Sequence, residues 1–159
     1  MSGDDSEARV ERFIARFEPG LADRVRAARA RLRSRFPGAF ELVYDNYNAL
    51  AIGFASTPKT ADVAISLAVY PRRVLLYFYY GASLADPHGP LEGEGRQGRY
   101  LCLKDVTQFD DPRVHELLVA AEAHGRSPTP EGAGGGAGHV IIKSVAARQR
   151  SRRPQGEAA

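Results

Sequence analysis

The chain has 159 residues, of which 43% are hydrophobic and 26% charged, and this composition is typical of one folded domain. Its single cysteine excludes an internal disulfide, and no stretch approaches the ~20 apolar residues of a membrane-spanning helix. The formal net charge of +3 is uneven, because residues 21–36 carry six arginines against one acid and residues 139–154 carry five cations against none. The acidic, polar start at Met1 to Glu7 does not resemble a signal peptide, so we expect a cytoplasmic protein without membrane association.

Two amphipathic helices are predicted before residue 37. The first has apolar residues at i, i+3, i+4 and i+7, namely Val10, Phe13, Ile14 and Phe17, and it ends at Pro19-Gly20. The second spans residues 21–35, and arginines flank both edges of its apolar stripe. Arginines in such positions usually lay their aliphatic stems against the core and keep their guanidinium groups in water, which we expect of all six.

After Pro37-Gly38 the apolar period changes from 3.6 to 2, which predicts an antiparallel meander of about five strands. The predicted strands are residues 40–44, 49–55, 63–70, 74–80 and 99–103. One face of this sheet carries large aliphatic side chains, and the other carries small residues and tyrosines. A later helix begins at Asp110-Asp111-Pro112 and ends at Gly125. We therefore predict an α+β fold in which the two N-terminal helices and this later helix pack on the aliphatic face.

The rest of the chain divides by composition. We assign residues 1–125 to the compact domain, 126–138 to a Gly/Pro-rich linker, 139–146 to a returning strand and 147–159 to a basic disordered tail. The backbone N–H and C=O groups of an apolar strand can pair equally well with an edge of its own sheet or with a partner's sheet. The strand at 139–145 is therefore expected either to join this sheet or to form a homodimer.

Several enzyme classes lack their motifs in this chain. Gly93, Gly95 and Gly98 match a dinucleotide-binding pattern in spacing, but a polar loop precedes them and a predicted strand follows where a helix is required. Cys102 has no identifiable base or paired metal ligand, and no G-x-S-x-G sequence is present. These patterns favour a protein that is not an enzyme.

The densest polar cluster beside a predicted strand is Tyr44-Asp45-Asn46-Tyr47-Asn48. One interpretation is a turn, because Asp and Asn side chains bond readily to their own backbone. The other is a pocket for a small ligand or a protein partner at the sheet edge and on its tyrosine-bearing face. The candidate ligand-binding residues are Tyr44, Asp45, Tyr47, Asn48, Tyr70, Tyr77 and Tyr79.

Two other binding classes also have candidate residues. Hard oxygen ligands in the loop before the fifth strand suit iron, although a solvated loop explains them without a metal; the candidates are Asp86, His88, Glu92 and Glu94. The basic tail suits nucleic-acid phosphates, with tyrosines stacking bases if they share its face; the candidates are Arg148, Arg150, Arg152 and Arg153. No cofactor is predicted beyond iron as this alternative.

Four sequence segments resemble bacterial proteins of the YdhG-like family, domain of unknown function 1801. They are Tyr44 to Asn48, Ser66 to Arg72, Asp86-Pro87-His88, and Ile141 to Val145 running on to Arg152-Arg153-Pro154. The resemblance covers about residues 8 to 154. It implies a compact α+β fold with helices against an antiparallel sheet, and kinship with frataxin-like iron chaperones. It implies no catalytic residues. The first hypothesis is therefore a non-enzymatic ligand- or protein-binding domain, with an iron chaperone and a nucleic-acid-binding protein as alternatives.

Overall fold

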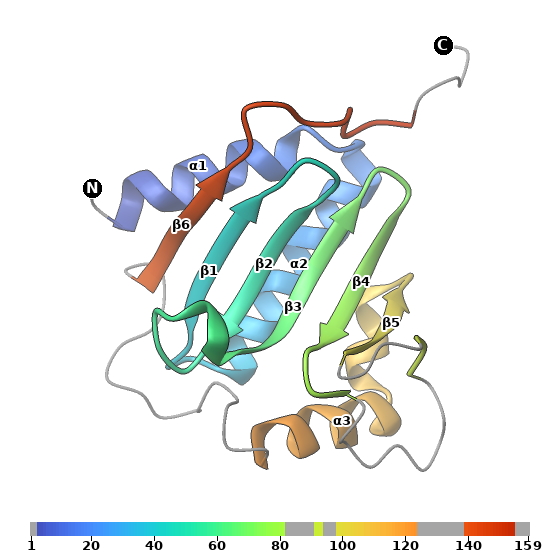
Figure 1. Ribbon diagram of the computed structural model, residues 1–159. Coiled ribbons are helices and arrows are strands. Elements are labelled where there is room, and N and C mark those ends of the chain that lie inside the picture. The colour runs from blue at the N-terminus through green and yellow to red at the C-terminus, as the bar shows by residue number, and fades with distance from the viewer. Residues whose placement is uncertain (1–2, 82–90, 94–97, 124–138, 155–159) are drawn as a thin grey trace.

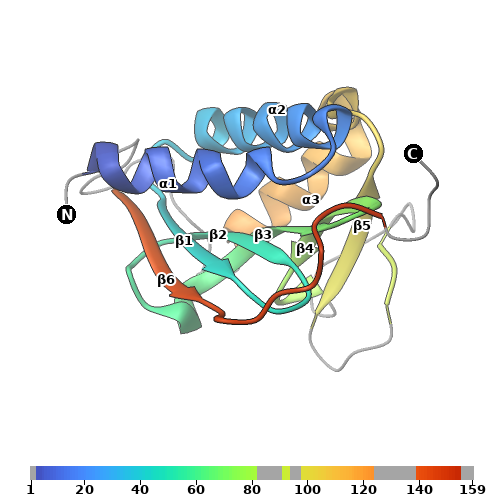
Figure 2. The same cartoon turned by 90° about the horizontal axis from the view of Figure 1, so that it is seen from above.

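The computed structural model describes residues 3–81, 91–93, 98–123 and 139–154, which form three α-helices and six strands in two layers (Figures 1 and 2). The helices are α1 (Gly3–Ala15), α2 (Pro19–Arg35) and α3 (Pro112–Ala123), with 3-10 turns η1 (Thr60–Asp62) and η3 (Val106–Asp110). The strands are β1 (Phe40–Asp45), β2 (Leu50–Ala55), β3 (Val63–Tyr70), β4 (Arg73–Phe78), β5 (Arg99–Leu103) and β6 (Val140–Val145). All three helices lie on one face of the sheet (Figure 2), so the predicted α+β fold is confirmed.

The strand order is β5-β4-β3-β2-β1-β6. Strands β1 to β5 pair antiparallel in chain order, as the alternation predicts. Strand β6 pairs parallel with β1, for example Leu42 with Ile141, so the sheet is mixed and has one strand more than the predicted meander. Parallel neighbours need a long crossover connection, and β2 to β5 and α3 all lie between β1 and β6 in sequence. One edge of the 139–145 strand is thus taken within its own chain, while a homodimer through this strand stays a prediction.

The core lies between the sheet and the helices. Alternate residues of each strand point to it, as in β4, where Val74, Leu76 and Phe78 are all fully buried. Phe17 and Phe36, at the ends of the two N-terminal helices, are each 1% exposed. Each large side chain buried in this way stabilises the fold by roughly 1.5–3 kcal/mol. The opposite face carries the tyrosines, but it is not made of small residues alone, because Leu42, Ala55 and Val63 form a second, smaller buried cluster there.

The expectation that all six arginines of α2 keep their charge in water is wrong for Arg29. Its side chain is 6% exposed, and its guanidinium group donates to Glu41 of β1 at 2.8 Å and to both carboxylate oxygens of Glu7 of α1 at 2.8 and 2.9 Å. Arg33 pairs with the same two acids. Burial favours the neutral form of Glu7, but the hydrogen bonds and charges of Arg29 and Arg33 outweigh it and hold the pKa of Glu7 below its ordinary value. Periodicity within α2 could not reveal acids supplied by other elements.

The C-terminal segment, residues 146–154, is docked on the protein. It leaves β6 and runs across the end of the sheet toward the turn between β3 and β4 (Figures 1 and 2). The predicted disordered tail therefore does not begin at 147, because Arg152 is 3% exposed and paired with Asp45. Residues 155–159 and the predicted linker at 126–138 lie outside the described residues. Within the described chain, the helices are too short or too polar to cross a membrane.

Candidate functional site

The sheet face opposite the helices carries several of the candidate tyrosines. The ring of Tyr77 packs edge-on against Tyr79, with 4.9 Å between centroids, and stacks on Tyr100 at 6.5 Å. Tyr79 is 38% exposed, and partial burial raises the pKa of its phenol. Tyr44 lies elsewhere on this face, where its hydroxyl bonds Thr60 at 2.7 Å. These tyrosines lie outside the main hydrophobic core, as the sequence predicts, but their rings contact one another or neighbouring residues.

A wide groove of about 860 Å³ lies at one end of the sheet. Three segments that are distant in sequence form it: the turn between β1 and β2, the turn between β3 and β4, and the C-terminal segment. Its lining residues are Tyr47, Asn48, Tyr70, Pro71, Arg72, Arg73, Gln149, Arg150, Ser151, Arg153 and Pro154. We call it the Arg–Tyr groove, because arginines and tyrosines make up more than half of this set.

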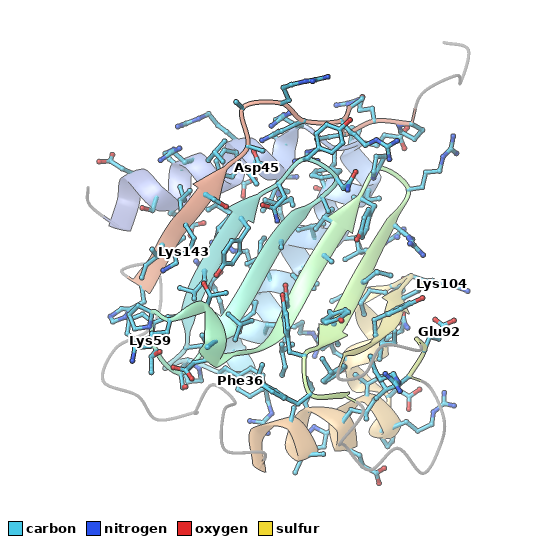
Figure 3. The ribbon with its side chains drawn as sticks, viewed as in Figure 1. Phe36, Asp45, Lys59, Glu92, Lys104 and Lys143 are labelled. Atoms are coloured by element: carbon cyan, nitrogen blue, oxygen red, sulfur yellow. The ribbon has the colours of Figure 1, made fainter. Side chains whose placement is uncertain are left out.

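The C-terminal wall of the groove is held in place by Asp45, the last residue of β1 (Figure 3). Asp45 is 1% exposed and accepts hydrogen bonds from Arg152 at 2.8 Å, Gln149 at 3.0 Å and Arg16 at 3.2 Å. The side chains of Asp45 and Arg152 are each 1% exposed, so this is a buried ion pair. Charge-assisted hydrogen bonds of this kind are the strong ones in proteins. The pair therefore fastens a basic segment to the end of the sheet.

Backbone contacts fix the same wall against the turn between β1 and β2. The amide of Arg150 donates to the carbonyl of Tyr47 at 2.8 Å. The guanidinium group of Arg152 donates to the carbonyl of Asn46 at 2.6 Å and lies 5.8 Å from the ring of Phe17. The backbones of Tyr47 and Arg150 are thus hydrogen-bonded neighbours, although about a hundred residues separate them in sequence.

The electrostatic character of the groove is cationic. Four exposed arginines line it, Arg72 and Arg73 from one wall and Arg150 and Arg153 from the other, and the described lining residues include no Asp or Glu. The guanidinium carbon of Arg73 lies 5.2 Å from the centre of the Tyr70 ring. Arg153 donates to the carbonyl of Arg16 at 3.3 Å. Since the described residues pair no carboxylate with Arg73, Arg150 or Arg153, the positive charge of these three is available to an anion.

The groove contains residues from two candidate sets that the sequence analysis assigned to different functions. Tyr47, Asn48 and Tyr70 from the ligand-binding set share the groove with Arg150 and Arg153 from the nucleic-acid set. The other candidates lie elsewhere: Tyr44, Tyr77 and Tyr79 on the open sheet face, Arg148 exposed beyond the groove lining, and Asp45 and Arg152 buried beneath it.

Two of the sequence candidates have a different role in the structure. The Asp45 carboxylate accepts hydrogen bonds from Arg152, Gln149 and Arg16, so Asp45 is neither a simple turn residue nor free to contact a ligand. Arg152 cannot reach a nucleic-acid phosphate while it is buried against Asp45. Both residues position the groove wall instead.

Sequence reasoning missed Arg72 and Arg73. They lie in the turn between β3 and β4. In a meander β1 and β3 run in the same direction, so the turns that follow them, with Tyr47 and with Arg72, lie at the same end of the sheet. Nothing in the sequence pattern shows that the C-terminal segment also lies there.

The metal candidates receive no support from the described part of the chain. Glu92 is exposed in an isolated bridge with Tyr100, and Asp86, His88 and Glu94 lie outside the described residues. Among the residues that are described, no three His, Cys, Asp or Glu side chains gather into a metal-binding group.

Comparisons with known proteins assign this chain to no family. No family model, no curated protein and no solved structure matches the chain.

Proposed function

We propose that this is a non-enzymatic binding protein that holds an anionic ligand in the Arg–Tyr groove. The observation that carries the proposal is the convergence of four exposed arginines on one groove with no acid among its described lining residues. Guanidinium groups present forked donors that match phosphate and carboxylate oxygens. Like charges gathered on opposite walls repel one another, and a bound anion relieves that repulsion.

The chemistry of the lining favours binding over catalysis. The most frequent general bases are His, Glu and Asp, and a hydroxyl nucleophile is usually activated by such a base beside it. The described lining offers hydroxyl groups from Ser151, Tyr47 and Tyr70, without such a partner beside them. The YdhG-like resemblance is consistent with the fold but names no ligand, so the groove alone supports this proposal. The cytoplasm remains the expected compartment on the sequence argument.

The proposal is tested by titrating the protein with inorganic polyphosphate, a linear polyanion without bases, at low salt of about 50 mM. We expect saturable binding by isothermal titration calorimetry, and loss of most of it in the double variant Arg150→Gln/Arg153→Gln. Both side chains are exposed, so the fold should survive the change. Arg148→Gln is the matched control, because Arg148 lies in the same segment and is exposed but does not line the groove. Equal losses in the double variant and the control, or no binding to the wild type, would refute the proposal.

A further inference from the structure

The Arg–Tyr groove combines positive charge with an exposed aromatic ring, and we propose that its ligand is single-stranded nucleic acid. The arginines contact the phosphates, and an unpaired base stacks on Tyr47. This inference rests on the proposed function and names the class of anion that the groove takes.

The distribution of the arginines favours an extended polyanion over a small ion. A small anion is held best by buried donors that converge on one point, whereas Arg72, Arg73, Arg150 and Arg153 are all exposed. They stand on two walls formed by the β3–β4 turn and the C-terminal segment. The groove is also open at the end of the sheet, so a chain can enter and leave it. A phosphodiester backbone supplies negative charge at regular intervals along such a path.

The aromatic component favours nucleic acid among extended polyanions. Tyr47 is 47% exposed, which is high for a large side chain, and its backbone is fixed by the Arg150 amide at 2.8 Å. An exposed ring on a fixed turn, beside cations, is the arrangement on which single-stranded bases stack. At the opposite wall the Arg73 guanidinium group lies over the Tyr70 ring, and a guanidinium plane is itself a stacking surface for a base.

The shape of the lining argues against a duplex. Proteins that read duplex DNA usually insert a helix or a two-stranded ribbon into the major groove. Here the described lining consists of two turns and an extended segment, and none of the three α-helices contributes to it. Stacking on Tyr47 also needs a base with a free face, which a paired and stacked duplex does not offer. The unpaired strand is therefore the form that fits.

The test measures fluorescence anisotropy of a labelled oligothymidylate of about 12 nucleotides, within the range of known single-strand site sizes. We expect saturable binding at about 50 mM salt and weaker binding of a duplex of the same length. If Arg73, Arg150 and Arg153 each contact one phosphate, the slope of log affinity against log salt is about −2. Arg150→Gln should bring that slope closer to zero by about 0.7.

Variants of Tyr47 separate stacking from charge. Tyr47→Ala should weaken oligothymidylate binding by about 5- to 150-fold, the loss of one stacked base, and should weaken polyphosphate binding much less, because polyphosphate has no base to stack. Tyr47→Phe keeps the ring and should bind like the wild type. Arg148→Gln should retain both the affinity and the salt slope. The side chain of Tyr47 is exposed, so circular dichroism should show each variant to be folded.

The outcomes distinguish the two proposals. This inference is overturned if oligothymidylate does not bind, or if Tyr47→Ala does not weaken its binding. The proposed function still stands in that case, provided that polyphosphate binding depends on the arginines. Equal affinity for duplex and single strand also overturns it, as does tighter binding of poly-glutamate, which would indicate an acidic protein partner. Failure to bind either polyphosphate or oligothymidylate overturns both proposals.

Discussion

Replacing Arg152 by methionine removes the buried cation that fastens the C-terminal segment. Its guanidinium group lies 2.8 Å from Asp45, and both side chains are 1% exposed. Methionine keeps an unbranched aliphatic chain beside Phe17 but supplies no charge and no donor. The variant therefore leaves the Asp45 carboxylate buried, with Arg16 at 3.2 Å and Gln149 at 3.0 Å as its remaining side-chain donors among the described residues.

The expected cost follows from the balance between attraction and desolvation. At 2.8 Å and an effective dielectric constant of about 20, the attraction between the two charges is about 6 kcal/mol, and desolvation of the two ions offsets much of it. Removing one partner from a buried pair costs about 3–5 kcal/mol, because the other charge stays buried. Since Asp45 retains two other donors, we expect Arg152→Met to lower the free energy of unfolding by about 3 kcal/mol, at the low end of that range.

Urea unfolding followed by circular dichroism measures this loss, and trypsin digestion reports whether the C-terminal segment detaches first. Arg148→Met is the matched control: it lies four residues away, is exposed, and should change stability by less than about 0.5 kcal/mol. The double variant Asp45→Asn/Arg152→Met should lose less unfolding free energy than the two single variants lose together, because it leaves no unpaired buried charge. If Arg152→Met matches the Arg148→Met control in both urea midpoint and tryptic lifetime, the buried pair does not hold the groove wall.

Three further predictions follow from other parts of the molecule. Glu7→Gln should destabilise the protein at neutral pH. Because the folded protein holds the pKa of Glu7 below its ordinary 4.5, the difference in unfolding free energy between wild type and variant should become smaller as the pH falls below that value. Urea midpoints measured across pH test this, and a difference independent of pH would contradict the pairing of Glu7 with Arg29 and Arg33. Gly81→Ala should cost about 1–3 kcal/mol, because an added Cβ would lie 2.5 Å from the Cβ and 2.9 Å from the backbone nitrogen of Arg99; an unchanged melting temperature would disprove that contact. Chelation of divalent cations should leave polyphosphate binding unchanged, because the described groove lining contains no carboxylate, imidazole or thiol ligand, and calorimetry with and without chelator compares the two.

Local patterns in the sequence were sufficient for most of the architecture. Alternation is a property of neighbouring residues, so a strand such as β4 and its inward residues Val74, Leu76 and Phe78 could be predicted without tertiary information. The parallel pairing of β6 with β1 could not, because main-chain hydrogen bonding does not specify which edge a strand joins.

The candidate site was predictable only in fragments. Tyr47 and Arg150 could each be named from the sequence as a candidate binding residue, but no local pattern showed that they are neighbours. The reason is the pair between Asp45 and Arg152, which joins residues 107 positions apart and follows no periodicity. A carboxylate after a strand suits a turn as well as a buried ion pair, and an arginine in a basic tail suits solvent as well as burial. Only the tertiary structure decides between these roles.

Nuclear magnetic resonance titration with polyphosphate tests the central claim most directly, because it locates the anion on the protein. Amide signals of the two turns and the C-terminal segment, residues 47–48, 70, 72–73 and 149–153, should shift together and saturate, while signals of α3 should stay in place. Shifts concentrated instead on the arginines of α2, or no saturable shifts at low salt, would show that the end of the sheet is not where an anion binds.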